Sequence, residues 1–424
     1  MIVGLILLVF ALLGTPLFAI IGAGALIGFA QAGYDLQVVT IEIYRLAETP
    51  VLVAIPLFTF AGYLLGEGGA PQRLVRLTQA WLGWMPGGLP IVSLAACAFF
   101  TAFTGASGIT IVALGALLLP ALLGAGYPEK FSLGMITTSG SLGLLFAPSL
   151  PLILYGVVAQ QAAVGGTVAI DDLFIAGILP GLLMLLVLSG YAIYRSVGLS
   201  GVRQPFAWTE AWAATREAAF ELPLPVVVLG GIYSGWLAVS EAAAVTAAYV
   251  LLVEFVIHRD IPLRELPRVV RESMMLVGAI LVILGVSLAS TNYAIDAGLP
   301  EQLLNWTRTW VESKATFIAV LIVMLLLLGM LLDIFSAIVI VVPIILPMAA
   351  SYGMNPLHLG ILFLAAMQLG YFTPPVGMNL FIAAYRFDRS IIDLVVATVP
   401  YFLLLLGCVL LIGYWEWLSL AFLG

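Results

Sequence analysis

The feature that most constrains this chain is a succession of long apolar runs with almost no charged residues inside them. A helix that crosses a membrane needs about 20 mostly apolar residues, so 424 residues hold roughly ten to thirteen spans. The runs are continuous rather than alternating, which argues against the strands of a membrane barrel. The sequence therefore predicts an all-α polytopic membrane protein. The runs cover residues 1–30, 49–66, 89–123, 131–160, 173–195, 222–256, 274–295, 315–350, 357–384 and 391–423.

The composition excludes several other classes of protein. Hydrophobic residues make up 63% of the chain and charged residues 9%, whereas a soluble domain has about 25% charged residues. Asp and Glu number 22 against 15 Lys and Arg, so the chain lacks the basic footprint of a nucleic-acid binder. Two cysteines, Cys97 and Cys408, and two histidines are too few for a disulfide framework or a histidine metal cluster.

The sequence gives no support for an enzyme. It contains no Gly-x-Ser-x-Gly elbow, no glycine-rich phosphate loop and no His-Glu-x-x-His motif. The adjacent carboxylates Asp171 and Asp172 lie at the edge of an apolar run and are better interpreted as a helix start than as a protease pair. Because the chain has no nucleotide-binding motif, any energy that it uses is expected to come from an ion gradient or another subunit.

Four short mixed segments are expected to lie along the membrane surface. They combine Trp or Arg with apolar residues at near-helical spacing, which is typical of interfacial helices. Plain polar loops are the alternative. The segments are 72–84, 206–220, 262–273 and 299–314. The tryptophans should form an interfacial belt, and the four arginines between 258 and 271 place that connection on the cytoplasmic side.

Two parts of the chain align with each other without a gap. Residues 97–160 match residues 324–387 at a constant offset of 227, which pairs Gly126 with Gly353 and Pro148 with Pro375. Proline and glycine shape the backbone, so a shared framework of these residues indicates a duplicated structure rather than chance matching of apolar residues.

Each repeat contains two interruptions. The first, at 101–108 and 329–336, places small or polar residues inside a long apolar run and suggests the tip of a re-entrant helical hairpin. The second, at 139–149 and 368–377, breaks the next helix with glycine and proline. Paired broken helices are the best sequence indicator of a transporter's midplane site. Proline lacks the N–H donor that would pair with a backbone carbonyl, so we expect free carbonyls near 370–373 that suit Na⁺. The N-termini of the half-helices carry partial positive charge and suit an anion.

Three polar residues near these interruptions each have two interpretations. Asp333 is the sole acid between Lys314 and Asp388; we favour Na⁺ coordination, with capping of a hairpin helix as the alternative. Asn379 could orient the broken backbone, which we favour, or contact substrate. Glu241 is expected in the first turn of a helix capped by Ser240 rather than at substrate.

These motifs together resemble the large membrane subunit of TRAP (tripartite ATP-independent periplasmic) transporters, the DctM-like family. The most specific stretches are TPPVGMNLF at 373–381 and SEAAAV at 240–245, and the resemblance extends in order over nearly the whole chain. Further matches are TGASGITIVALGALLLP, AGYPEKF, SGSLGLLFAPSLPLILYG and GIYSGWLAVSEAAA.

The resemblance implies a Na⁺-coupled importer of organic acids in the bacterial inner membrane, working by an elevator mechanism with two inverted repeats. Implied partners are a small four-helix membrane subunit, a periplasmic substrate-binding protein and membrane lipid. The implied division is N-terminal scaffold and arm at 1–88, transport repeats at 89–165 and 315–387, further scaffold and arms at 166–314, and a C-terminal helix at 388–424.

Family binding sites carry over to the tips and breaks. The first implied sodium site comprises Thr104, Ser107, Gly143, Phe146 and Ala147, and the second comprises Gly329, Asp333, Gly370, Thr373 and Val376. Substrate would lie between them, against Ser107, Gly108, Ser149 and Asn379.

The first tip and break depart from the family pattern. They read Thr-Gly-Ala-Ser and Ala-Pro-Ser where the family has Ser-Gly-Ser-Ser and Pro-Pro-Ser, which puts side-chain ligation there in doubt. A stand-alone Na⁺- or H⁺-coupled anion symporter and a membrane-embedded enzyme are the alternative functions.

Overall fold

The computed structural model describes residues 6–7, 9–10, 13–85, 87–162, 168–197 and 206–423. Within these ranges the chain forms helices and turns and no β-strand, which confirms the all-α prediction. Eight of the described helices are long and apolar enough to cross a membrane, and a pair bent by 43° would make a ninth. This is fewer than the expected ten to thirteen spans, because several apolar helices, such as α6 and α19, are shorter than a full span.

The first half of the chain contains the outer helices and then the first repeat. The outer helices are α2 (Leu17–Ala32), α3 (Gln37–Ala47), η1 (Pro50–Val53), α4 (Ala54–Glu67) and α5 (Ala70–Leu82). The first repeat comprises α6 (Gly88–Thr104), α7 (Ser107–Gly124), α8 (Glu129–Ser139), η2 (Leu142–Leu145) and α9 (Leu150–Gln161).

The middle of the chain returns to the outside of the molecule, and the second repeat follows. The middle helices are α10 (Ile170–Ala176), α11 (Ile178–Ser196), α12 (Trp208–Glu217), α13 (Pro223–Tyr233), α14 (Val239–Leu252), the π-helix η3 (Val253–Ile257), η4 (Leu263–Glu265), α15 (Leu266–Asp296) and α16 (Leu299–Arg308). The second repeat and C-terminus comprise α17 (Lys314–Leu331), α18 (Ile334–Ser351), α19 (Pro356–Gly370), α20 (Met378–Phe387), α21 (Ile391–Tyr414) and α22 (Trp417–Leu420).

The helix boundaries follow the sequence repeat closely. The hairpins α6–α7 and α17–α18 turn at the same aligned positions, and α8 and α19 begin at aligned residues as well. Both following helices are then broken: η2 lies between α8 and α9, and seven residues lie between α19 and α20. The aligned peptide bonds Ala147–Pro148 and Pro374–Pro375 are both cis. The predicted hairpin and broken helix are therefore present in each repeat.

The two repeats exchange packing partners. The second hairpin arm α7 packs on α20 of the other repeat, and its counterpart α18 packs on α9. Such reciprocal contacts are those of two equivalent units facing each other, and they bring both sets of interruptions into the middle of the molecule.

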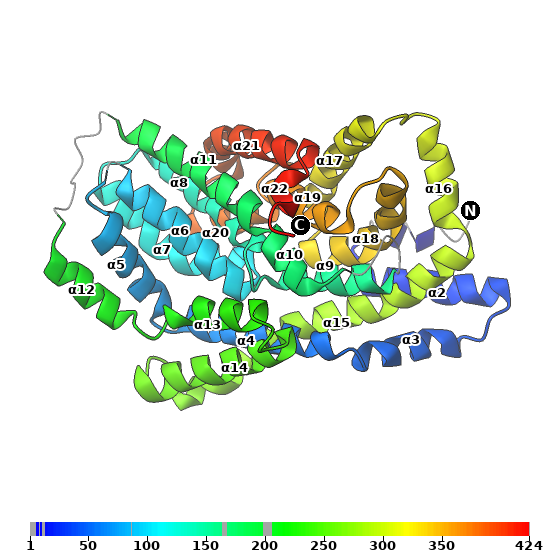
Figure 1. Cartoon of the computed structure of the whole chain (residues 1–424), viewed down its shortest axis with the longest axis horizontal. Coiled ribbons are helices and arrows are strands. Elements are labelled where there is room, and N and C mark those ends of the chain that lie inside the picture. Colours follow the sequence, from blue (N-terminus) through cyan, green and yellow to red (C-terminus); the bar gives the residue numbers. More distant parts are fainter. Residues whose placement is uncertain are drawn as a thin grey trace.

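The remaining helices enclose the repeats from two sides. The 31-residue α15 is about 46 Å long and packs against α2, α3, α4 and α18, while α14 packs on α4. On the other side, α21 packs on α8 and α11. Figure 1 shows α15, α4 and α14 along one edge and α11, α17 and α21 along the opposite one.

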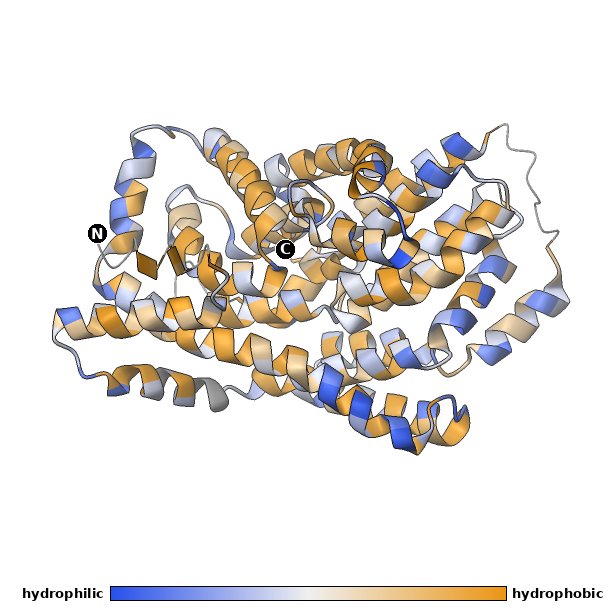
Figure 2. Cartoon of the chain, turned by 180° about the vertical axis from the view of Figure 1, so that it is seen from behind, coloured by the Kyte–Doolittle hydropathy of each residue, from blue (hydrophilic) through white to orange (hydrophobic). Residues whose placement is uncertain are grey.

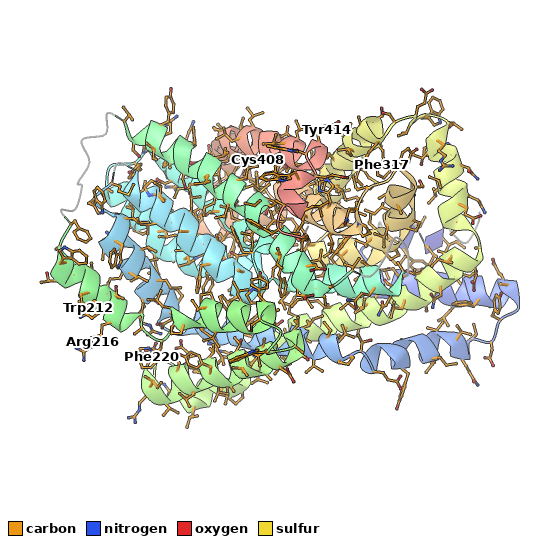
Figure 3. The ribbon with its side chains drawn as sticks, viewed as in Figure 1. Trp212, Arg216, Phe220, Phe317, Cys408 and Tyr414 are labelled. Atoms are coloured by element: carbon orange, nitrogen blue, oxygen red, sulfur yellow. The ribbon has the colours of Figure 1, made fainter. Side chains whose placement is uncertain are left out.

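The predicted interfacial segments lie at the periphery of the molecule, and one of them requires a correction. Apolar residues cover most of the helices, and polar residues gather on the peripheral ones (Figure 2). Trp212 is 69% exposed and lies with Arg216 at the outer edge on α12 (Figure 3). The segment 262–273 is not a separate interfacial helix: it forms η4 and the first turns of α15, because Pro267 is tolerated in the first turn of a helix.

Candidate functional site

Both hairpin tips open onto one cleft between the repeats and the outer helices α4 and α15. Its volume is about 540 Å³. The outer wall is made by Tyr63, Gly66 and Glu67 of α4 with Glu272 and Leu276 of α15. The inner wall is made by Gly105, Ala106, Ser107, Gly108, Ile109, Val112, Ala113, Leu144, Asp333, Ile334, Phe335, Tyr371, Met378 and Ile382. The cleft thus gathers residues from both tips and both breaks.

The first tip is a tight turn that leaves a helix N-terminus without a side-chain cap. Gly105 ends α6 with φ +64, a left-handed conformation that favours glycine, and a Cβ there would lie 2.6 Å from Leu150 Cδ1. Ala106 is the N-cap of α7 and offers no side-chain acceptor. Ser107 and Gly108, which follow it, line the cleft. The first turn of α7 therefore keeps backbone N–H groups for another acceptor.

The second tip differs, because Asp333 caps its helix. Asp333 Oδ1 accepts hydrogen bonds from the backbone N–H groups of Phe335 and Ser336, each at 3.0 Å, and Oδ2 accepts one from Ser336 Oγ. The Tyr371 hydroxyl accepts the Ile334 N–H. The capping interpretation of Asp333 is confirmed, and its coordination of Na⁺ stays a prediction.

The two helix breaks pack against the hairpins through glycine. A Cβ on Gly143 would lie 2.5 Å from the Ala102 nitrogen, and a Cβ on Gly370 would lie 2.5 Å from Gly329 Cα. Ala102 and Gly329 are aligned in the repeat, as are Gly143 and Gly370. The same close backbone approach therefore holds each break against the first arm of its own hairpin.

The backbone carbonyls at the second helix break accept hydrogen bonds that the sequence did not predict. Gly370 O accepts the Thr373 N–H at 3.0 Å, and Tyr371 O accepts the Asn379 N–H at 2.8 Å. The Thr373 hydroxyl donates to Leu369 O at 2.6 Å. The expectation of free carbonyls at 370 and 371 was wrong, because the turn supplies its own donors to replace those that proline removes.

Asn379 joins the first tip to the second break. It is fully buried; its Oδ1 accepts a hydrogen bond from Ser107 Oγ at 2.8 Å, and its Nδ2 donates to Thr137 O at 3.3 Å. These hydrogen bonds agree with the favoured orienting role, and contact with substrate stays a prediction. Of the predicted substrate residues, Ser107 and Gly108 line the cleft, whereas Ser149 and Asn379 are buried outside its lining.

The other predicted sodium ligands surround the tips and breaks. Thr104 is buried, and its hydroxyl accepts the Ala106 N–H at 3.5 Å. Phe146 and Ala147 follow η2 and are half-buried, and Val376 is 41% exposed. In the described ranges no three His, Cys, Asp or Glu side chains gather as a metal site. A sodium ion here would depend mainly on backbone carbonyls and hydroxyls.

Sequence reasoning missed the outer wall of the cleft. Glu67 and Glu272 both pair with Arg268 of α15, at 2.5 and 3.2 Å. The available signal was an acidic residue at the edge of each apolar run, but only the fold brings α4 and α15 together.

The predicted cap of α14 was misplaced: Ala238, not Ser240, is the N-cap, and its N–H donates to Glu241 Oε2 at 2.9 Å. The backbone of Ala238 is extended, as at a helix N-cap, so α14 is capped two residues before the predicted position.

Comparison with known sequences identifies the family. The profile of the tripartite ATP-independent periplasmic transporter DctM component matches residues 3–418. The chain belongs to this DctM family. It is 32% identical to the C4-dicarboxylate TRAP transporter large permease protein DctM of Rhodobacter capsulatus, over 98% of this chain and 97% of that protein.

Other DctM relatives carry different substrates in their names. The ectoine/5-hydroxyectoine TRAP transporter large permease protein UehC of Ruegeria pomeroyi is 30% identical, over 95% of this chain and 94% of the relative. The isethionate TRAP transporter permease protein DctMQ of Oleidesulfovibrio alaskensis is 31% identical, over 98% of this chain and 65% of the relative. The crystal structure of the Alcanivorax borkumensis YdaH transporter shares the fold, with TM-score 0.57 and 17% identity over 87% of this chain and 84% of that one.

Membership of the DctM family establishes the general role of the chain and its location. The chain is the large permease subunit of a TRAP transporter and a multi-pass protein of the inner membrane, and its relatives are permeases rather than enzymes. As the family name implies, such a permease works with a small membrane subunit and a periplasmic binding protein.

Proposed function

We propose that this permease imports organic acids by Na⁺ symport, receiving them from its periplasmic binding protein and moving its two repeats as an elevator against the outer helices. The observation that carries the proposal is the cleft that unites both hairpin tips and both helix breaks. The relatives' names, which cover C4-dicarboxylates, ectoines and isethionate, support small acids as the substrate class.

The difference between the tips favours one orientation of the substrate. The N-terminus of α18 is already occupied by the carboxylate of Asp333, whereas that of α7 has no side-chain cap. A helix N-terminus with free N–H groups attracts anions. The substrate carboxylate therefore binds at Ser107 and Gly108, and Na⁺ binds beside it at the tips and breaks.

The charge distribution favours a cleft that faces the cytoplasm in this conformation. The arginine-rich connection that precedes α15 is cytoplasmic by the positive-inside rule, and Glu272 of the cleft wall lies near that end of α15. The conformation is thus an inward-open one, from which substrate leaves.

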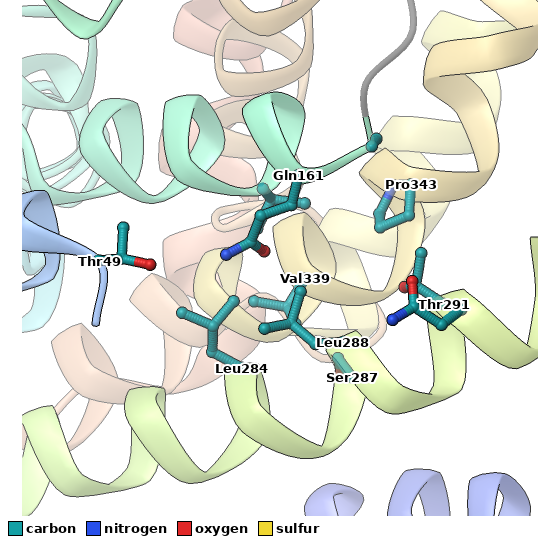
Figure 4. Close-up of a pocket in the computed structure, with 11 residues that line it drawn as sticks. Thr49, Gln161, Leu284, Ser287, Leu288, Thr291, Val339 and Pro343 are labelled. Carbon is teal, nitrogen blue, oxygen red and sulfur yellow. The ribbon is translucent and has the colours of Figure 1, made fainter. Parts of the chain in front are cut away.

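A second, smaller cavity supports movement along α15. It has a volume of about 140 Å³ and lies between Ser287 and Thr291 of α15, Gln161 of α9 and Val339 of α18 (Figure 4). Leu276 of the first cleft and Ser287 are 11 residues apart, or about 17 Å along the helix. In the outward-open state the hairpin tips move toward this polar end of α15.

The test is reconstitution in proteoliposomes with one component omitted at a time. Uptake of a C4-dicarboxylate should require an inward Na⁺ gradient, the small subunit and the binding protein together. Uptake by the large subunit alone would indicate a stand-alone symporter, and turnover without vectorial movement would indicate a membrane enzyme. Uptake that is independent of Na⁺ with all components present would contradict the coupling.

A further inference from the structure

Away from the cleft, a partly buried cluster of charged side chains holds the junction between α4 and α5. Arg73 of α5 is 7% exposed, and Glu221 and Glu254 are fully buried. His258 and Asp260 lie in the loop after η3 and complete the cluster. These five residues come from three separate parts of the chain, and the transport mechanism described above uses none of them.

The guanidinium of Arg73 pairs with all three carboxylates. Arg73 Nε lies 2.5 Å from Glu221 Oε1, and Nη1 lies 2.6 Å from Asp260 Oδ2. The contact between Nη2 and Glu254 Oε1 is the longest, at 3.3 Å. Glu254 is therefore the carboxylate that Arg73 stabilises least.

The cluster contains more negative charge than it can neutralise. Three carboxylates face one guanidinium; Glu221 and Glu254 are fully buried and Asp260 is 27% exposed, and a buried charge without its own partner is costly. Glu221 Oε2, Glu254 Oε2 and His258 Nε2 are all buried without a hydrogen-bond partner. His258 Nε2 lies 3.8 Å from Glu221 Oε1, too far for a good bond. A bound proton would lower this cost.

Two members of the cluster stay ionised. Burial raises the pKa of Asp260, but the Arg73 side chain and the Gly69 N–H outweigh it, so this pKa lies below its ordinary value. Burial lowers the pKa of Arg73, and Asp260 and Glu221 more than reverse that effect. Of the neighbouring groups, the Tyr249 hydroxyl donates to Phe220 O, and Arg268 pairs with Glu67 just before the junction. None of these supplies a further cation to Glu254.

We propose that this cluster is a proton-binding site and that Glu254 carries the bound proton. A protonated Glu254 becomes a hydrogen-bond donor, and the Asp260 carboxylate, which interacts with its side chain, is the acceptor at hand. The proton removes one unit of excess charge and gives an unpartnered oxygen a partner. The ligand is the proton alone, and the proposal does not rest on the proposed transport function.

The bound proton acts on a structural joint. The Gly69 N–H donates to Asp260 Oδ2 at 2.9 Å, and Glu254 Oε2 lies so close to Gly68 that a Cβ there would be 2.1 Å away. α5 begins at this joint and packs on α6, the first arm of hairpin one. Loss of the proton restores repulsion inside the cluster and loosens the anchor of the arm that leads into the first repeat.

The test compares the full chain with Glu254→Gln, which mimics the protonated carboxyl. Near neutral pH the folded chain holds a proton on Glu254 that the unfolded chain has released. The free energy of unfolding must therefore fall as pH rises, and the equilibrium constant for unfolding grows by up to tenfold per pH unit. The apparent melting temperature of the unmodified protein should therefore drop between pH 6 and pH 9. That of Glu254→Gln should not, and at the alkaline end the variant should be the more stable of the two.

Infrared absorption of protonated carboxyl groups gives a second measurement on the unmodified protein. A protonated carboxyl band should be present at neutral pH, disappear at alkaline pH and be missing from Glu254→Gln. Glu210→Gln, which removes an exposed partner of Arg76, is the matched control and should leave both readouts unchanged. The proposal is overturned if no such band titrates, or if Glu254→Gln keeps the pH slope and Glu221→Gln removes it.

Discussion

At the scale of single residues, this permease depends on positions where backbones touch. Gly329 and Gly370 meet in the second repeat as Ala102 and Gly143 do in the first. No side chain fits between these segments, so the interruptions are fixed by packing as well as by proline. Asp333 shows the complementary case, in which one side chain satisfies a helix end that the hairpin turn leaves open.

Gly370→Ala tests the close approach. Its Cβ would lie 2.5 Å from Gly329 Cα, which forces α17 and α19 apart and should destabilise the protein by roughly 1–3 kcal/mol, as overpacking does. The measurement is thermal unfolding in detergent. Gly407→Ala on α21 is the matched control, because its Cβ meets nothing within 4 Å; equal stability of the two variants would contradict the packing argument.

Asp333→Asn separates the two roles of this residue. Asparagine keeps a capping oxygen but removes the negative charge, so α18 should stay folded while the Na⁺ concentration for half-maximal uptake rises about tenfold, or ~1.4 kcal/mol. Thr373→Val should shift it in the same direction. Uptake is measured against Na⁺ with all components present. Normal expression with an unchanged Na⁺ dependence in both variants would remove the second sodium site.

At the scale of helices, the duplicated hairpins have diverged in the charge at their tips. Ala106 and Asp333 occupy aligned N-cap positions. One tip is therefore electropositive and the other is neutralised by its own carboxylate. In the proposed function, the uncapped tip receives the substrate anion and Na⁺ binds beside it in the same cleft.

Ala106→Asp should abolish that asymmetry. The new carboxylate would cap α7 as Asp333 caps α18 and would repel a substrate anion, so the apparent affinity for a dicarboxylate should fall at least about tenfold, or ~1.4 kcal/mol. Ala106→Ser is the control, since it caps the helix without adding charge. Equal losses in the two variants would show that capping, not charge, matters at this tip.

At the scale of the whole molecule, the repeats form an inner body and α2–α4, α14 and α15 form a wall beside it. The wall contacts the inner body through α15 on α18 and through α4 on α6, and two cavities lie along α15, at 272–276 and at 284–292. This arrangement suits a body that slides along a fixed helix, because polar residues at each end can receive the hairpin tips.

Cysteine cross-linking tests that movement in a protein with Cys97 and Cys408 replaced by alanine. Ile109→Cys with Leu276→Cys, which line opposite walls of the present cleft, should be joined in the resting protein by a bifunctional thiol reagent that spans the cleft. Ile109→Cys with Ser287→Cys should cross-link only after the tips move. Gel mobility measures both. Failure of the second pair to form under any condition of Na⁺ and substrate would argue against sliding along α15.

Much of the fold was readable from the chain. The proline–glycine framework predicted both hairpins and both breaks, because those residues act on the backbone locally. Glu67 and Glu272 were not identified as cleft residues, since nothing in the sequence brings the ends of α4 and α15 together. The pairing of Arg73 with Glu221, 148 residues away, was equally invisible.

The sequence by itself determined the membrane class, the duplication and the residues at which helices must stop, because apolar length and the stereochemistry of proline and glycine act over a few residues. Only the tertiary structure decided that Asp333 binds its own helix, that Asn379 ties one tip to the other break, and that a single arginine faces three acids, two of them buried. These outcomes depend on which distant backbones come within hydrogen-bonding distance, and that is set by packing of the whole chain.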